Sequence, residues 1–396
     1  MEAIHYMHAQ ILSAIDAASG ELIELARRIH ATPEIAFQER QAAAWLTEAL
    51  ERYGFHVERG VADLETAFRA EIAGSDHGPT VAILAEYDAL PEIGHACGHN
   101  LISTAALGAG IGLAAVRQHL PGRVAVMGTP AEEGGGGKVI MLERGAFHGV
   151  DAALMFHPAS YTLSGRPSLT SYRLAITFAG KPAHAAAAPD EGVNALDGLI
   201  QTFVGIGLLR QQVRDDARIH GIITYGGAAP NIIPDRAEAV LTVRATDDGY
   251  ARELLERVIN IARGAALATG TTLEHVSRKG YEAIKPNRTL ARAFSRHLEA
   301  LGWPEDTPPD RQRMGSTDMG DLSQAIPSIH PYVAIGPKEM VGHTLEFREA
   351  SLGDRGLEAM LAAAKAMALT AYDLMARPEL LAEVRREFAG GPPAVA

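Results

Sequence analysis

Residues 81–100 read Val-Ala-Ile-Leu-Ala-Glu-Tyr-Asp-Ala-Leu-Pro-Glu-Ile-Gly-His-Ala-Cys-Gly-His-Asn, and the rest of the chain is organised around this stretch. Its apolar start predicts a buried strand, and the polar residues that follow predict a loop at the end of that strand. The loop contains the only cysteine, Cys97, with His99 two residues after it and His95 two residues before it. Because cysteine and histidine are common metal ligands, the loop is a candidate metal-binding segment.

Two later apolar runs end in the same way. Residues 124–127 (Val-Ala-Val-Met) lead to Glu132 and Glu133, and residues 152–156 lead to His157. Helical patterns separate these runs, and the alternation predicts an α/β fold with a mainly parallel sheet covered on both faces. In open α/β sheets, ligands bind beyond the carboxyl ends of the strands. One site can therefore collect all three polar clusters.

A different pattern begins near residue 169. It predicts, in order, a strand at 172–179, a helix at 193–209, strands at 220–225 and 237–244, a helix at 249–267 and a strand at 271–278. This βαββαβ order predicts a ferredoxin-like domain of residues 169–284, inserted into a larger domain of residues 1–168 and 285–396. In the larger domain, residues 332–335 are expected to form the last strand of the sheet.

Composition excludes several classes of protein. The chain has 396 residues, of which 47% are hydrophobic and 21% charged, and its formal net charge is −12. This acidic balance argues against a nucleic-acid partner, and the lack of roughly 18 consecutive apolar residues argues against a membrane partner. A single cysteine cannot form an internal disulfide, which fits the cytoplasm. We expect the partners to be a small-molecule substrate and a second copy of the chain.

The polar clusters contain enough ligands for two metal ions. A dinuclear site needs several oxygen, nitrogen or sulfur ligands and one residue that bridges the ions. The residues that would supply such a set are Cys97, His99, Glu133, His157 and His343. Adjacent side chains point opposite ways in extended backbone, so one of Glu132 and Glu133 can bind metal while the other acts as a general base. Alone, each histidine could be a core residue and the two glutamates a solvated pair; their coincidence at three strand ends favours the metal site.

Six motifs give the chain a family resemblance. They are 88–91 (Asp-Ala-Leu-Pro), 95–99 (His-Ala-Cys-Gly-His), 128–136 (Gly-Thr-Pro-Ala-Glu-Glu-Gly-Gly-Gly), 180–185 (Gly-Lys-Pro-Ala-His-Ala), 230–234 (Pro-Asn-Ile-Ile-Pro) and 342–344 (Gly-His-Thr). In this order and over nearly the whole chain, they resemble the dizinc-type metallopeptidases related to carboxypeptidase G and aminoacylase. The most similar branch contains aminobenzoyl-glutamate hydrolase, the indoleacetyl-amino-acid hydrolases and the aminoacylase-like dipeptidases.

The resemblance implies a zinc-peptidase-like catalytic domain that holds two divalent ions, Zn or Mn, per subunit. Cys97 would replace the bridging aspartate of the wider family, and the other four candidate ligands would complete the coordination. Glu132 would deprotonate the metal-bridging water and pass the proton to the leaving amine, while Asp88 would orient a ligand. Where many relatives have a histidine, this chain has Glu86, and His99 is expected to take up the missing coordination. Asn100 stands where the indoleacetyl-type enzymes have aspartate, which favours the aminobenzoyl-glutamate and dipeptidase side.

The inserted domain resembles the dimerisation domain of this family. His184, Asn231 and Arg244 match positions that bind the substrate carboxylate or polarise the scissile carbonyl, with His184 reaching into the partner's active site. Arginine offers a planar fork for a carboxylate, and asparagine and histidine can donate to an oxyanion. The polar loop 316–320 is expected to line the pocket, without an assigned role.

The function expected is therefore metal-dependent hydrolysis of the amide bond in an N-acyl amino acid or dipeptide-like substrate with a free carboxylate. Two alternatives remain at this point. Cys97 could be a nucleophile that uses His99 or His95 as its base, a mechanism that would not need Glu133, His157 and His343. The chain could also be a catalytically silent binding protein that keeps the fold.

Overall fold

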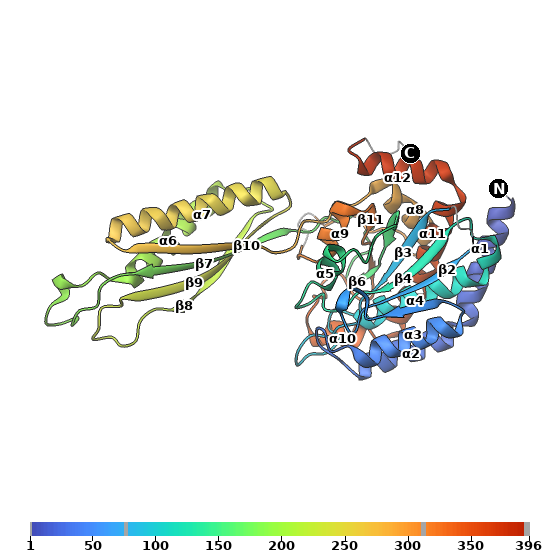
Figure 1. Ribbon diagram of the computed structural model, residues 1–396, viewed down its shortest axis with the longest axis horizontal. Helices are drawn as coiled ribbons and strands as arrows, with labels where there is room; N and C mark the ends of the chain where they lie inside the picture. The colour runs from blue at the N-terminus through green and yellow to red at the C-terminus, as the bar shows by residue number, and fades with distance from the viewer. Residues whose placement is uncertain (1, 75–77, 310–313, 392–396) are drawn as a thin grey trace. The chain divides into compact units, whose positions relative to one another are not determined.

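The computed structural model describes residues 2–74, 78–309 and 314–391, which form two compact units. Unit 1 is built from the described residues of 1–166, 285–313 and 317–396. Unit 2 consists of Pro167–Ile284 and Met314–Ser316. Each unit contains its own sheet and its own helices (Figure 1).

A six-stranded sheet in the order β1-β2-β4-β3-β5-β11 organises unit 1. Its strands are β1 (His56–Arg59), β2 (Phe68–Ala73), β3 (Thr80–Ala85), β4 (Arg123–Gly128), β5 (Ala152–Leu154) and β11 (Ser328–Ile329). Strand β3 pairs in parallel with β4 and β5, and β5 pairs in parallel with β11, whereas β1 and β2 add an antiparallel edge. The predicted α/β class with a mostly parallel sheet is confirmed.

Among the helices of unit 1, α4 (His99–Ala115) begins at the candidate metal-binding loop. The others are α1 (Glu2–Ala17), α2 (Ser19–Ala31), α3 (Arg40–Arg52), α5 (Gly137–Glu143), α8 (Arg288–Ala300), α9 (Met319–Ala325), α10 (Leu345–Ala350), α11 (Asp354–Ala376) and α12 (Pro378–Phe388). Helix α4 contacts β3, α1, α2 and α11. It is apolar on all sides because it is enclosed on all sides.

Two strand predictions need correction. The strand expected at 152–156 ends as β5 at Leu154, and His157 lies inside a separate strand, β6 (His157–Ala159). The strand expected to close the main sheet is β12 (Tyr332–Ala334), which pairs with β6 in a second, two-stranded parallel sheet. The reason is that β5 and β11 leave the main sheet together, and their continuations pair again a few residues later.

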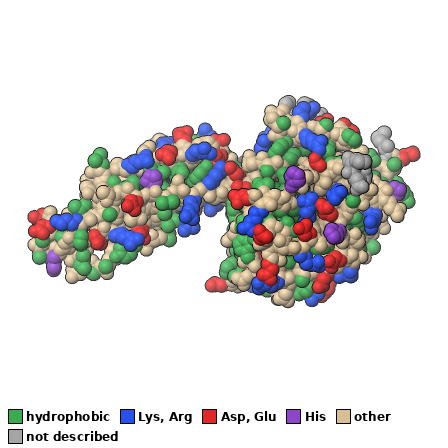
Figure 2. Space-filling model, in the orientation of Figure 1, with side chains coloured by type: hydrophobic (Ala, Val, Ile, Leu, Met, Phe, Trp, Pro, Cys, Tyr) green, Lys and Arg blue, Asp and Glu red, His purple; other side chains and the backbone are tan. Residues whose placement is uncertain are grey.

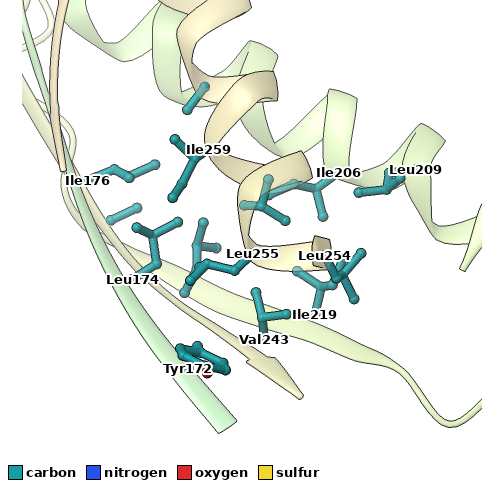
Figure 3. Packing of buried hydrophobic residues seen from close by; sticks show 14 of the residues in the cluster. Tyr172, Leu174, Ile176, Ile206, Leu209, Ile219, Val243, Leu254, Leu255 and Ile259 are labelled. Carbon is teal, nitrogen blue, oxygen red and sulfur yellow. The ribbon is translucent and has the colours of Figure 1, made fainter. Parts of the chain in front are cut away.

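Unit 2 has the predicted βαββαβ order. Its elements are β7 (Thr170–Ala179), α6 (Ala195–Leu209), β8 (Arg218–Tyr225), β9 (Arg236–Ala245), α7 (Asp248–Thr269) and β10 (Thr272–Lys279). The strands form an antiparallel sheet in the order β10-β7-β9-β8. Alternate residues of β7, among them Leu174 and Ile176, pack against Leu255 and Ile259 of α7 and complete a core of its own (Figure 3).

The surface charges and the longest helix relate to two expectations from composition, those about nucleic acid and about membranes. On the face shown in Figure 2, Lys and Arg side chains are interspersed with Asp and Glu and form no continuous basic patch over the residues described. Helix α11 is long and apolar enough to cross a membrane, but 83% of its apolar window is buried inside the protein, as in the core helix of a folded domain.

Candidate metal centre

The five candidate metal ligands form two groups that share one residue. Cys97, His99 and His157 make one group, and Cys97, Glu133 and His343 make the other; within each group the ligand atoms lie within 4.8 Å of one another. His99, Glu132 and Glu133 form a third group of the same kind. The predicted ligands thus lie together, with Cys97 at the junction and Glu132 beside them.

A glycine allows Cys97 to approach His157. Gly98 has a φ of 77°, and a Cβ built on it would lie 2.5 Å from Pro158 Cγ, so a larger residue would push the two segments apart. Cys97 Sγ lies 3.4 Å from His157 Nε2. Because His157 Nδ1–H donates to Pro158 O at 2.7 Å, its Nε2 is left to face the centre.

Asp88 orients His99. The Nδ1–H group of His99 donates to Asp88 Oδ1 at 3.0 Å and to the main-chain oxygen of Asp88 at 2.9 Å. The other nitrogen, Nε2, is buried without a hydrogen-bond partner among the described residues. A buried imidazole with one nitrogen fixed and the other unpartnered is suited to a metal ion.

Glu39 fixes the turn that presents Glu132 and Glu133. Ala131 precedes them with a φ of 61°, which is unusual for a residue other than glycine. Its N–H donates to Glu39 Oε1 at 2.9 Å, and the Glu133 N–H donates to Asp88 Oδ2 at 2.9 Å. Glu39 is fully buried, and burial raises its pKa to about 7. No pattern in the sequence had pointed to Glu39.

His343 reaches the centre from the turn before α10. Its N–H donates to Ala96 O at 2.9 Å, next to Cys97, and its Nε2 lies 3.2 Å from Glu133 Oε1. The side chain of His343 is 53% exposed, so this corner of the centre is open to solvent.

The electrostatics of the centre fit divalent cations. Burial lowers the pKa of His157 to about 3, which keeps its imidazole neutral and able to bind a metal. Burial and the nearby carboxylates of Glu86 and Asp318 raise the pKa of Glu132 well above its usual range. Such an excess of buried carboxylate is the environment that a metal ion neutralises.

The same environment disfavours Cys97 as a nucleophile. Burial, with a contribution from Glu133, raises the pKa of the Cys97 thiol, whereas catalytic thiols have a lowered pKa. The proposed base His95 is buried, belongs to none of the ligand groups, and packs its ring 6.0 Å from that of His30. Burial also lowers the pKa of His95 to about 3.

Glu86 is held by a lysine that the sequence had not singled out. The Lys138 ammonium donates to Glu86 Oε1 and, at 2.7 Å, to Asp318 Oδ1. All three side chains are at most 1% exposed. Asp318 lies in the segment 316–320, which was expected to be a loop throughout, but Met319 and Gly320 instead begin α9, and Asp318 directly precedes that helix. Its role in the structure is to pair with Lys138. Glu86 takes part in neither group that contains Cys97.

The three substrate-binding candidates lie in unit 2. His184 and Ile232 form an isolated antiparallel β-bridge, and the Ala185 N–H donates to Asn231 O at 3.0 Å. His184 and Asn231 therefore lie in adjacent loops. His184 Nδ1 accepts from two main-chain N–H groups, at 3.3 and 3.2 Å, which leaves Nε2–H as a donor. Arg244 lies on β9, where Nη1 donates to Ser316 Oγ at 3.2 Å.

Comparisons with known proteins agree with this geometry. The family model for peptidase family M20/M25/M40 matches residues 82–372. Xaa-Arg dipeptidase of Mus musculus is 40% identical over 390 residues, which cover 94% of this chain and 90% of the relative. A p-aminobenzoyl-glutamate hydrolase polypeptide of Escherichia coli strain K12 is 32% identical over 455 residues, with 94% and 93% covered. The predicted branch of the family is confirmed.

Solved structures support the fold. A dinuclear metal-binding peptidase of Bacillus subtilis superposes with a TM-score of 0.74 at 24% identity, covering 91% of this chain and 99% of the other. An aminohydrolase-like protein from Staphylococcus aureus gives a TM-score of 0.80 at 21% identity. The family model and the sequence relatives show that the chain belongs to peptidase family M20/M25/M40 and is a hydrolase of amide bonds.

Proposed function

We propose that the chain is a dinuclear metallodipeptidase in which Cys97 bridges two divalent ions, Zn or Mn. The observation that carries this proposal is that two ligand groups, Cys97–His99–His157 and Cys97–Glu133–His343, share one thiol. A sulfur ligand with imidazole and carboxylate neighbours suits either metal, and zinc more strongly. The Bacillus subtilis structural neighbour is itself described as a dinuclear metal-binding peptidase.

When bound, two such ions would polarise the scissile carbonyl and lower the pKa of the attacking water. The residues of the chain supply the remaining steps. Glu132 accepts the proton of the attacking water and delivers it to the nitrogen of the leaving amine. Asp88 keeps His99 Nδ1 protonated and its Nε2 directed at the centre. Glu39 and Asp88 hold the main chain around Glu132 and Glu133.

The substrate we propose is a dipeptide with a free carboxylate and a basic C-terminal residue. The 40% identity to Xaa-Arg dipeptidase supports this choice, and the 32% identity to p-aminobenzoyl-glutamate hydrolase supports an acidic product as the alternative. Arg244 is suited to bind the substrate carboxylate, because its guanidinium has a fork of donors. The Nε2–H of His184 and the amide of Asn231 are suited to donate to the developing oxyanion.

We further propose that unit 2 dimerises the chain through α6 and β8. Ile200, Val204 and Leu208 recur every four residues on α6 and are 48%, 59% and 73% exposed. Strand β8 is an edge of its sheet, and its residues Ile222 and Ile223 are 66% and 44% exposed. An exposed apolar helix stripe and an edge strand with exposed apolar residues in the same unit suit a symmetric partner that continues the sheet. We place the dimer in the cytoplasm, where a chain with one cysteine needs no oxidising environment.

A substrate panel tests the proposed function. The purified chain, loaded with Zn²⁺ or Mn²⁺, is assayed on dipeptides ending in Arg or Lys, dipeptides ending in neutral residues, N-acetyl amino acids and p-aminobenzoyl-glutamate. We expect kcat/KM for the basic dipeptides to exceed the others by roughly 10-fold or more. A chelator should abolish the activity. Activity that survives the chelator would instead support the cysteine mechanism, and no hydrolysis on any substrate would support a silent binding protein.

A further inference from the structure

Lys138 is a buried cation next to the metal centre. The tight turn before α5 brings it there, since a Cβ on Gly137 would lie 1.9 Å from Pro130 O. Asp318 holds the lysine at both ends: Oδ2 accepts from the Lys138 N–H at 3.0 Å and Oδ1 from its Nζ at 2.7 Å. A buried ammonium is costly unless it is paired, so this placement depends on its two carboxylate partners.

The two carboxylate oxygens of the second partner, Glu86, have different surroundings. Its Oε1 accepts from Lys138 Nζ. Its Oε2 is buried without a hydrogen-bond partner among the described residues and lies 3.7 Å from His99 Nε2, which is also unpartnered. A carboxylate oxygen thus borders the Cys97–His99–His157 group without belonging to it.

The number of ligands in that group has a chemical consequence. Metal sites with four protein ligands are closed and structural, whereas catalytic sites keep three protein ligands and an open position. A carboxylate is a good ligand, so a freed Glu86 could become the fourth. We propose that Lys138 is a positioning residue that holds Glu86 out of the Cys97–His99–His157 group and thereby keeps a coordination position open there. This inference rests on the proposed dinuclear function.

Metal binding by full-length variants tests the proposal. Lys138→Met removes the ammonium and releases Glu86. We expect one of the two Zn²⁺ ions to bind at least about 10-fold more tightly than in the wild type, as measured by competition with a chromogenic chelator. In the Mn²⁺-loaded variant, water-proton relaxation should report fewer water molecules on the metal than in the wild type. Lys138→Arg, which keeps the charge, should behave as the wild type.

Two controls separate this role from a general effect on folding. Adding Glu86→Gln to Lys138→Met should return the Zn²⁺ affinity to the wild-type value, because the competing ligand is gone. Glu86→Gln alone should bind two ions with wild-type affinity, and this variant decides the question if Lys138→Met does not fold. Loss of an ion in Glu86→Gln would overturn the proposal, as would a folded Lys138→Met with unchanged or weaker affinity. A wild-type chain that binds no metal would overturn the proposed function as well.

Discussion

Cys97 is a residue whose role depends on its neighbours. The sequence allowed a nucleophile with His99 or His95, whereas the structure puts Cys97 Sγ 3.4 Å from His157 Nε2 and in both ligand groups. If Cys97 bridges two ions, a carboxylate of similar reach can replace it in part. We expect Cys97→Ala to lose most bound metal and Cys97→Asp to retain metal and some activity, as measured by elemental analysis and dipeptide hydrolysis. Full metal content in Cys97→Ala would rule out the bridging role.

Glu132 and Glu133 are adjacent but should differ in function. Glu133 belongs to the group with Cys97 and His343, while Glu132 does not. We expect Glu132→Gln to lower kcat by roughly 10²–10⁴-fold, because proton transfer is lost, and to leave the metal content unchanged. Glu133→Gln serves as the matched comparison, and it should lose metal together with activity. An active Glu132→Gln chain would contradict the assignment of the base.

The residues that the sequence identified and those it missed differ in a physical way. Ligands such as His99 and Glu133 follow apolar runs in recognisable motifs, so their chemistry can be inferred locally. A lysine after four glycines has the signature of a solvated loop. Lys138 is nevertheless buried, because its partners Glu86 and Asp318 are 52 and 180 residues away in sequence. Pairings at such separations leave no periodic pattern in a single sequence.

Among the elements of unit 1, three helices meet at one buried carboxylate. Asp373 of α11 accepts from His8 of α1 at 2.9 Å and from His297 of α8 at 3.0 Å, and its side chain is 5% exposed. Burial acts to raise the pKa of Asp373, but the bonds from His297 and His8 outweigh it and hold the pKa below its usual range. The carboxylate therefore stabilises the packing of these helices while it is ionised.

The lowered pKa of Asp373 determines how the stability of the protein depends on pH. Because the folded pKa of Asp373 is lowered, its contribution is fully present above the unfolded pKa of about 3.9 and is lost as the pH falls through the folded value. We expect Asp373→Asn to lower the free energy of unfolding by roughly 1–3 kcal/mol at pH 7 and by progressively less below about pH 4, measured in urea. Asp16→Asn is the control, since Asp16 also links α1 to α11 but is 61% exposed, and it should cost less than about 1 kcal/mol. Equal losses at pH 7 and pH 3 would contradict the linkage.

Element prediction succeeded where one face of an element is buried. In unit 2 the strands alternate and the helices are amphipathic, so the βαββαβ order could be inferred from sequence. The prediction of one continuous strand was wrong between β5 and β6. Residues 152–159 are apolar almost throughout and give no signal that the chain passes from one sheet to another. His157 was still placed at the centre, since both interpretations put it just beyond Leu154.

The exposed apolar stripe of α6 gives an element-scale test of assembly. Leu208 is 73% exposed, and a charge there would have to be buried in the proposed interface. We expect Leu208→Asp to weaken dimerisation by roughly 100-fold or more, seen as a shift toward monomer in light scattering. Leu267→Asp is the matched control, because Leu267 is 88% exposed on α7, outside the proposed interface. A wild-type chain that is monomeric at all concentrations would end the dimer proposal.

At the scale of the whole molecule, the candidate residues are divided between two units. Unit 1 carries the metal ligands and Glu132, whereas His184, Asn231 and Arg244 lie in unit 2. Each unit has its own sheet and core, so the metal centre can form without the substrate-binding residues. If His184 acts on the centre of the partner subunit, binding of metal and completion of the site are separate events, and only the second requires two chains.

This division leads to a test by complementation. His184→Ala and Glu132→Gln chains should each be inactive as homodimers but bind metal normally. The two variants are mixed in equal amounts, dissociated under mild conditions and allowed to reassociate, so that half of the dimers contain one chain of each kind. Each of these mixed dimers has one centre with Glu132 from one chain and His184 from the other. We expect about a quarter of the wild-type activity per chain, because one centre in four is complete. If His184 instead serves the centre of its own chain, every centre in the mixture lacks one of the two residues and no activity returns.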